Sequence, residues 1–150
     1  MRTYNPVMIA REFLYVREAQ SVGQNRGIRV EAVQHWSGGE QADSWCMEML
    51  WMWFDLAYQG QPPFGRMQAC ESLHALAKQQ QWLVASPAVG DIALTVNDAG
   101  HAHHVALVTG IEPLTAIAGN TSSDGVSVNG DGVYEHQISP VGKVFVRVPA

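Results

Sequence analysis

The stretch "DSWCMEMLWMWFDLA", residues 43–57, decides the fold, because it is apolar almost all the way round and carries one cysteine, Cys46, near its start. A helix that is hydrophobic on every face is normally buried in the centre of a domain. Asp43 or Ser44 has a side chain suited to cap such a helix, which we expect to run to about Tyr58. The stretch therefore predicts a central helix with a thiol in or just before its first turn.

Three further helices are expected around this one. Asn5 followed by Pro6 is typical of a helix start, and the helix that begins there should end before Gly23. The helical spacing of apolar residues also predicts helices over 28–36 and roughly 66–80. The last helix has an inward stripe, in which we interpret the second cysteine as packing material: Met67, Cys70, Leu73, Leu76 and Ala77.

The second half of the chain is predicted to form strands. From Gly90 onwards the apolar residues alternate, and turn-forming residues separate the alternating segments. In the first segment Ile92, Leu94 and Val96 should face inward. Helices followed by strands predict an α+β domain with N-terminal helices packed on a C-terminal antiparallel β-sheet. The expected strands are 91–96, 103–110, 114–120, 132–138 and 143–148.

The size and composition of the chain restrict its organisation and its partners. With 150 residues, 47% of them hydrophobic, the chain should form a single domain over residues 1–150. Its net charge is −5 and its nine Lys and Arg residues are scattered, which argues against nucleic acid or an anionic membrane as a partner. Two cysteines are too few for a disulfide framework. We expect a monomer.

The N-terminal segment gives an expectation about location. Its apolar run before Arg11 covers only residues 7–10, which is too short for the core of a signal peptide or for a membrane span. We therefore expect a protein that is cytoplasmic as synthesised, with no signal peptide.

Three residues are of the types that a thiol hydrolase uses, and their order along the chain is compatible with that chemistry. The start of its helix should make the Cys46 thiol more acidic, because unpaired N–H groups point outward there. His104 opens an expected strand and could act as the base, and Asn120 ends the next strand and could fix the imidazole tautomer. Adjacent antiparallel strands can bring these two side chains together. Each residue also has a structural interpretation, as a buried thiol, a core histidine and a turn cap.

The sequence resembles a known family at six successive blocks. They are "VREAQSVGQNRGIRVEAVQHW" (16–36), "SWCMEMLWMWF" (44–54), "GDIALT" (90–95), "HVALVTG" (104–110), "IAGNTSSDG" (117–125) and "KVFVRVP" (143–149). Together they resemble the CHAP domain, the cysteine- and histidine-dependent amidohydrolase/peptidase relatives of the NlpC/P60 enzymes. The most specific elements are the Trp-Cys pair that heads an apolar helix and the Gly-Asp strand followed by His-Val-Ala-Leu-Val.

The resemblance implies a papain-like α+β fold and a hydrolase of peptidoglycan. Cys46 would be the nucleophile, His104 the general base and acid, and Asn120 the orienting residue, with no cofactor and no metal. The substrate would be peptidoglycan or its stem peptides. The bond would join sugar to stem peptide, as in an N-acetylmuramoyl-L-alanine amidase, or lie within the peptides, as in an endopeptidase. Loops such as 59–66 and 121–132 would set the specificity.

Several alternatives remain at this point. "HAHH" offers His101, His103 and His104, of which we choose His104 as the base because it directly precedes Val105. His103 is the other choice, since the two side chains point to opposite faces of a strand. The histidines with Asp98 or Asp91 could instead bind zinc, although they lack the fixed spacing of a strong zinc motif.

The function also has alternatives. The chain could be a cysteine amidase that acts on an amide outside the cell wall. It could instead be a catalytically inactive CHAP-like module with a binding or structural role, for instance in a phage particle. A wall hydrolase without a signal peptide would need delivery by a phage lysis system, a virion or an injection apparatus, or release by cell lysis.

Overall fold

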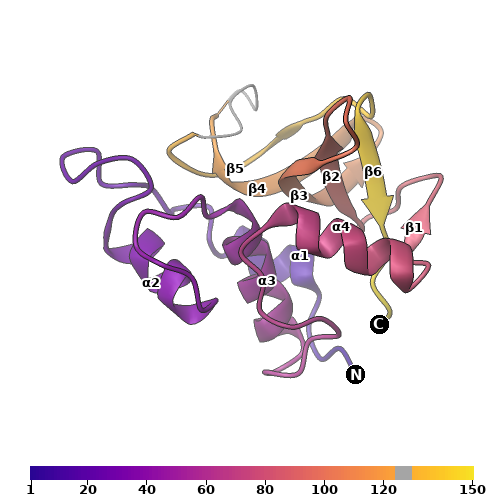
Figure 1. Cartoon of the computed structure of the whole chain (residues 1–150), viewed down its shortest axis with the longest axis horizontal. Coiled ribbons are helices and arrows are strands. Elements are labelled where there is room, and N and C mark those ends of the chain that lie inside the picture. Colours follow the sequence, from indigo (N-terminus) through magenta and orange to yellow (C-terminus); the bar gives the residue numbers. More distant parts are fainter. Residues whose placement is uncertain (124–129) are drawn as a thin grey trace.

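Helices occupy the first half of the chain and strands the second, as Figure 1 shows. The computed structural model describes residues 1–123 and 130–150, and these residues form four helices and six strands. The α+β class predicted from the sequence is therefore confirmed. The helices are α1 (Pro6–Arg11), α2 (Ile28–Trp36), α3 (Cys46–Ala57) and α4 (Cys70–Gln79). The strands are β1 (Leu83–Val84), β2 (Ile92–Val96), β3 (Ala102–Ile111), β4 (Leu114–Thr121), β5 (Gly132–Gln137) and β6 (Lys143–Val146).

The strands form one antiparallel sheet in the order β1-β6-β2-β3-β4-β5. β3 lies inside the sheet, where Leu107 pairs with Ile92 of β2 on one side and with Ile117 of β4 on the other. Helices α1, α3 and α4 gather on one side of this sheet in Figure 1, and all three contact β3. The predicted packing of N-terminal helices on an antiparallel sheet is thus confirmed.

Helix α3 lies at the centre of the main core. Eleven of its twelve residues are buried, and burying each large apolar side chain contributes about 1.5–3 kcal/mol to folding. The sheet supplies alternate residues to the same core: Ile92 and Leu94 belong to it and Val96 packs against it, whereas Ala93 lies in a separate cluster. The predicted inward face of β2 and the predicted burial of the central helix are both confirmed.

Helix α1 starts as predicted and ends early. Proline is its first residue, and Asn5 Oδ1 accepts a hydrogen bond of 3.0 Å from the Val7 N–H. The helix stops at Arg11, and the chain continues as turns over residues 12–15, in which the Phe13 N–H donates a hydrogen bond to the Ala10 carbonyl oxygen. Arg17 forms an antiparallel bridge with Gly132 at the start of β5. The segment around Arg17 thereby pairs with the start of β5, which lies at one edge of the sheet.

The starts of α3 and α4 differ from the expectation. Trp45 is the N-cap of α3 and makes no side-chain capping hydrogen bond, so the capping role expected of Asp43 or Ser44 is wrong. Asp43 Oδ2 instead accepts a hydrogen bond of 2.8 Å from the Glu40 N–H. Helix α4 begins at Cys70 rather than near residue 66, because Ala69 before it is extended, with φ −109° and ψ 131°.

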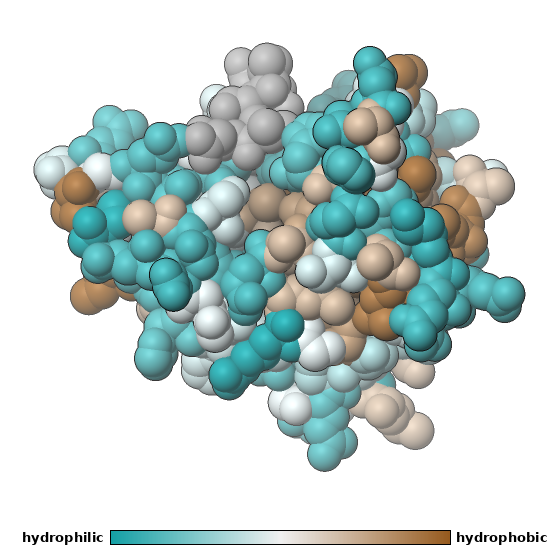
Figure 2. All heavy atoms as spheres, viewed as in Figure 1, coloured by the Kyte–Doolittle hydropathy of each residue, from teal (hydrophilic) through white to brown (hydrophobic). Residues whose placement is uncertain are grey.

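The surface drawn in Figure 2 is mostly hydrophilic. Hydrophobic spheres gather over the middle of this face, where the starts of α3 and α4 lie in the same view in Figure 1. None of the helices in residues 1–123 and 130–150 is long and apolar enough to cross a lipid bilayer.

Candidate active site

Cys46 is the first residue of α3, so its thiol lies at the N-terminal end of the central helix. Only 4% of its surface is exposed. The backbone N–H of Met47 contributes to lowering the pKa of this thiol, which favours a thiolate there. The predicted placement of the thiol at a helix start is confirmed.

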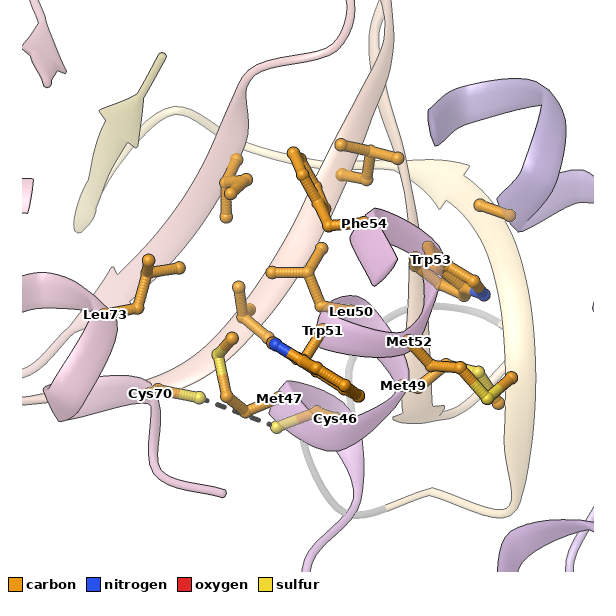
Figure 3. Close-up of a cluster of buried hydrophobic side chains, with 14 of the residues drawn as sticks. Cys46, Met47, Met49, Leu50, Trp51, Met52, Trp53, Phe54, Cys70 and Leu73 are labelled. Atoms are coloured by element: carbon orange, nitrogen blue, oxygen red, sulfur yellow. Dashed lines mark hydrogen bonds between the residues drawn. The ribbon is translucent and has the colours of Figure 1, made fainter. Parts of the chain in front are cut away.

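Cys70 contacts this thiol, which the sequence did not suggest. Its Sγ lies 3.7 Å from Cys46 Sγ, as the dashed line in Figure 3 marks. Cys70 is the first residue of α4, and both cysteines are free. The interpretation of Cys70 as mere packing material is therefore incomplete. One local signal that a helix begins at Cys70 was present: Glu71 follows Cys70, and acidic residues are favoured in the first turn of a helix.

His104 is the histidine of "HAHH" that interacts with Cys46. It lies on β3 opposite Thr95 and is 8% exposed. His103 is the extra residue where the pairing of β2 with β3 shifts, and both His103 and His101 are exposed. The bulge thus separates the buried imidazole from its two exposed neighbours.

The surroundings of Cys46 lower the pKa of its thiol well below the ordinary value. The largest cause is a hydrogen bond with the Cys70 thiol, and burial opposes it. A hydrogen bond with His104 and the charge of its imidazole lower the pKa further. The pKa of the Cys70 thiol is raised instead, chiefly by its hydrogen bond with Cys46 and by burial.

Asn120 is fully buried at the end of β4, in a left-handed conformation with φ 54°. Its Nδ2 donates a hydrogen bond of 2.9 Å to Ser44 Oγ, two residues before Cys46. At this end of the β3–β4 ladder the last pair is Leu107 with Ile117, so the paired register does not extend to His104 and Asn120. Among the described residues, neither His104 Nδ1 nor Asn120 Oδ1 has a hydrogen-bond partner.

The structure therefore brings Cys46 and His104 together and ties Asn120 to the segment that leads into the nucleophile helix. A close approach fixes this arrangement. A Cβ added at Gly119 would lie 2.9 Å from the Trp45 ring and 3.0 Å from Met49 Cβ, so β4 passes directly over the start of α3.

Glu48 is a buried carboxyl that sequence reasoning missed. Its Oε2 accepts a hydrogen bond of 2.7 Å from Ser37 Oγ, and its side chain is fully buried. Burial raises its pKa to about 7, the Ser37 hydrogen bond opposes the rise, and the charges of Asp43 and Cys46 add to it. A carboxyl two residues after Cys46 thus changes charge near neutral pH.

Of the two loops expected to set specificity, residues 59–66 lie within the described chain. This loop lines one side of a surface pocket of about 430 Å³, whose other walls include Trp36 and Trp51. Arg66 stands over the Trp51 ring at 5.7 Å from its centroid. Residues 124–129 of the second loop, 121–132, lie outside the described residues.

The zinc alternative required ligands that converge. Within residues 1–123 and 130–150, no three His, Cys, Asp or Glu side chains are grouped so that they could hold a metal ion.

Comparisons with known proteins found no match to this chain among family models, curated proteins or solved structures.

Proposed function

We propose that the chain is a CHAP-like cysteine amidohydrolase of papain-like fold that cleaves an amide bond in peptidoglycan. One observation carries the proposal: Cys46, at the first residue of a buried helix, interacts with the imidazole of His104 on the sheet. A thiol at a helix start beside an imidazole is the arrangement that nucleophilic catalysis by cysteine uses. The resemblance of the sequence blocks supplies the substrate class.

The proposed reaction begins with attack of the Cys46 thiolate on the amide carbonyl carbon. The backbone N–H of Cys46 is a candidate donor to the resulting oxyanion, and one such donor is typically worth about 3–4 kcal/mol in other hydrolases. Protonated His104 gives its proton to the leaving amine and a thioester remains. His104 then removes a proton from water as the water oxygen attacks the thioester carbonyl carbon, and the C–S bond breaks to release the carboxylic acid and regenerate the thiolate.

Asn120 has the orienting role in this proposal. Its Oδ1 is an acceptor and His104 Nδ1 can carry a proton, and both atoms are buried without a partner among the described residues. A hydrogen bond from Nδ1 to Oδ1 would satisfy both atoms and would leave Nε2 free to act as the base. The hydrogen bond from Asn120 to Ser44 would keep the amide in place meanwhile.

A catalytically inactive CHAP-like module is the second candidate, and the burial of the site favours it. Cys46 is 4% exposed and His104 is 8% exposed, so a substrate carbonyl reaches the sulfur only after the side chains over it move. A module that only binds needs no such movement.

The proposed hydrolase acts as a monomer on peptidoglycan or its stem peptides, delivered by a phage lysis system, a virion or an injection apparatus.

Purified cell walls test the proposal. The wild-type protein should release new amino groups, and Cys46→Ala should release none while keeping the circular dichroism spectrum of the folded protein. Mass analysis of the fragments then distinguishes cleavage after the sugar from cleavage within the peptides. Release by Cys46→Ala would contradict the nucleophile assignment, and absence of release by the folded wild type would favour the inactive module. A cysteine amidase for another amide would spare walls yet cleave model peptides.

A further inference from the structure

Two thiols meet at the candidate site, and the proposed reaction uses only one of them. Cys70 Sγ lies 3.7 Å from Cys46 Sγ, a contact in which one thiol can donate its hydrogen to the other. Each cysteine is the first residue of its helix, so the N-terminal ends of α3 and α4 converge on the sulfur pair, as Figure 3 shows. Both helix ends favour negative charge at this point.

The pair can carry no more than one negative charge near neutral pH. The side chains are 4% and 6% exposed, so water screens them little. Two thiolates at this separation would repel each other strongly, and ionisation of one thiol leaves the other protonated. The protonated thiol is then a donor directed at a charged acceptor, which is the stronger kind of hydrogen bond.

The neighbouring groups decide which sulfur is charged. His104 on β3 and the backbone N–H of Met47 favour a thiolate at Cys46. Glu48, on the same helix, acts against that charge when it is ionised. Glu71, next to Cys70, disfavours a thiolate there. The negative charge therefore settles on Cys46, and Cys70 keeps its proton.

We propose that Cys70 is a positioning residue for the nucleophile, whose thiol donates a hydrogen bond to the Cys46 thiolate and stabilises its ionised form. The inference rests on the proposed function only in naming Cys46 as the nucleophile. The opposite pKa shifts of the two thiols agree with it, since contact with the other cysteine is the largest cause of each shift.

The pH dependence of alkylation tests this role. The rate of labelling of Cys46 by iodoacetamide is measured against pH, with the labelled peptide identified by mass spectrometry. In Cys70→Ala the midpoint for Cys46 should move to higher pH. At pH values below both midpoints, a shift of one unit lowers the labelling rate about tenfold. Cys70→Ser retains a hydrogen-bond donor, so its Cys46 midpoint should stay close to that of the wild type. Ser72→Ala, on an exposed residue of the same helix, is the matched control.

Comparing midpoints rather than rates removes the effect of altered access to the sulfur. Thermal unfolding of each variant establishes that it is folded at the temperature of the assay. An unchanged Cys46 midpoint in folded Cys70→Ala would overturn the inference. So would a midpoint for Cys70 that does not fall in Cys46→Ala, because the coupling of two sites is reciprocal.

The inference and the proposed function fail separately. If the Cys46 midpoint shifts as expected but walls and model peptides stay intact, the hydrolase is wrong and the thiol pair stands. If walls are cleaved but the midpoint does not move in folded Cys70→Ala, the positioning role of Cys70 is wrong and the hydrolase stands.

Discussion

The side-chain amide of Asn120 donates a hydrogen bond of 2.9 Å to Ser44 Oγ, and this bond joins the end of β4 to the residues that lead into α3. It is a contact between positions 76 residues apart in the chain. Because Cys46 follows two residues after Ser44, the bond helps to set where the nucleophile helix begins relative to the sheet.

A double-mutant cycle measures this bond. Ser44→Ala should lower the free energy of unfolding by about 1 kcal/mol. Asn120→Ala should cost more, because alanine also disfavours the left-handed φ of 54° by roughly 1–2 kcal/mol. That backbone cost occurs with or without the serine, so the coupling isolates the hydrogen bond at about 0.5–1.5 kcal/mol. Urea denaturation of the wild type, the two single variants and the double variant gives the free energies of unfolding. If the losses of the single variants add up to that of the double variant, the two side chains do not interact.

Gly119→Ala should destabilise the protein by about 1–3 kcal/mol, because the new methyl group meets a tightly packed core. The added Cβ would lie 2.9 Å from the ring of Trp45, whose side chain is fully buried and bonded through Nε1 to Glu18. Gly65→Ala is the matched control, since nothing lies within 4 Å of its added Cβ. Equal midpoints of thermal unfolding for the two variants would show that β4 does not press on α3.

Glu48 should make a contribution to the stability of the wild type that decreases as the pH rises from about 4.5 to about 7, because its carboxyl ionises over this range. In this window the folded protein retains a proton that the unfolded chain has released, so the free energy of unfolding decreases by roughly 2–3 kcal/mol from this group. Glu48→Gln keeps an acceptor for Ser37 and cannot ionise, so it should lack this part of the slope. Glu40→Gln, on an exposed residue, should keep it. Identical slopes of unfolding free energy against pH for Glu48→Gln and the wild type would show that Glu48 does not have a raised pKa in the folded protein.

Hydrogen peroxide should convert the two thiols into an intramolecular disulfide. The Cys46 thiolate attacks one peroxide oxygen and forms a sulfenic acid with release of hydroxide, and the Cys70 thiol then attacks that sulfur with release of water. The sulfurs need only close from 3.7 Å to about 2.05 Å. Intact mass should decrease by two hydrogen atoms, and dithiothreitol should restore it. Cys70→Ser should stop at the sulfenic acid, whereas covalent dimers of the wild type would argue against the pair.

Local patterns predicted most of the fold. The all-round apolar character of residues 43–57 placed α3 in the core, and alternation from Gly90 onwards placed the long strands. The position of Cys46 at a helix start followed from the same pattern. These features depend on neighbours in sequence, which is why one sequence is enough to infer them.

The features that were missed depend on contacts between distant segments. Helix α1 ends at Arg11 and Arg17 forms a bridge with Gly132 at the start of β5, and no local signal predicts that pairing. The meeting of the two sulfurs joins residues 24 apart in the chain and requires two helix starts to converge. Only the chain packing reveals that Glu48, inside an apolar stretch, is buried against Ser37.

The helix that holds the reactive sulfur is also the one around which the interior is built. Loosening of the protein by heat or urea should therefore uncover Cys46 together with the side chains that stabilise the domain. Any increase of its rate of modification by a thiol reagent above the rate in the folded state then reports the population of opened molecules, much as amide hydrogen exchange does for buried peptide groups. Cys46 thus provides a natural probe of cooperative opening, which needs no added dye or engineered label.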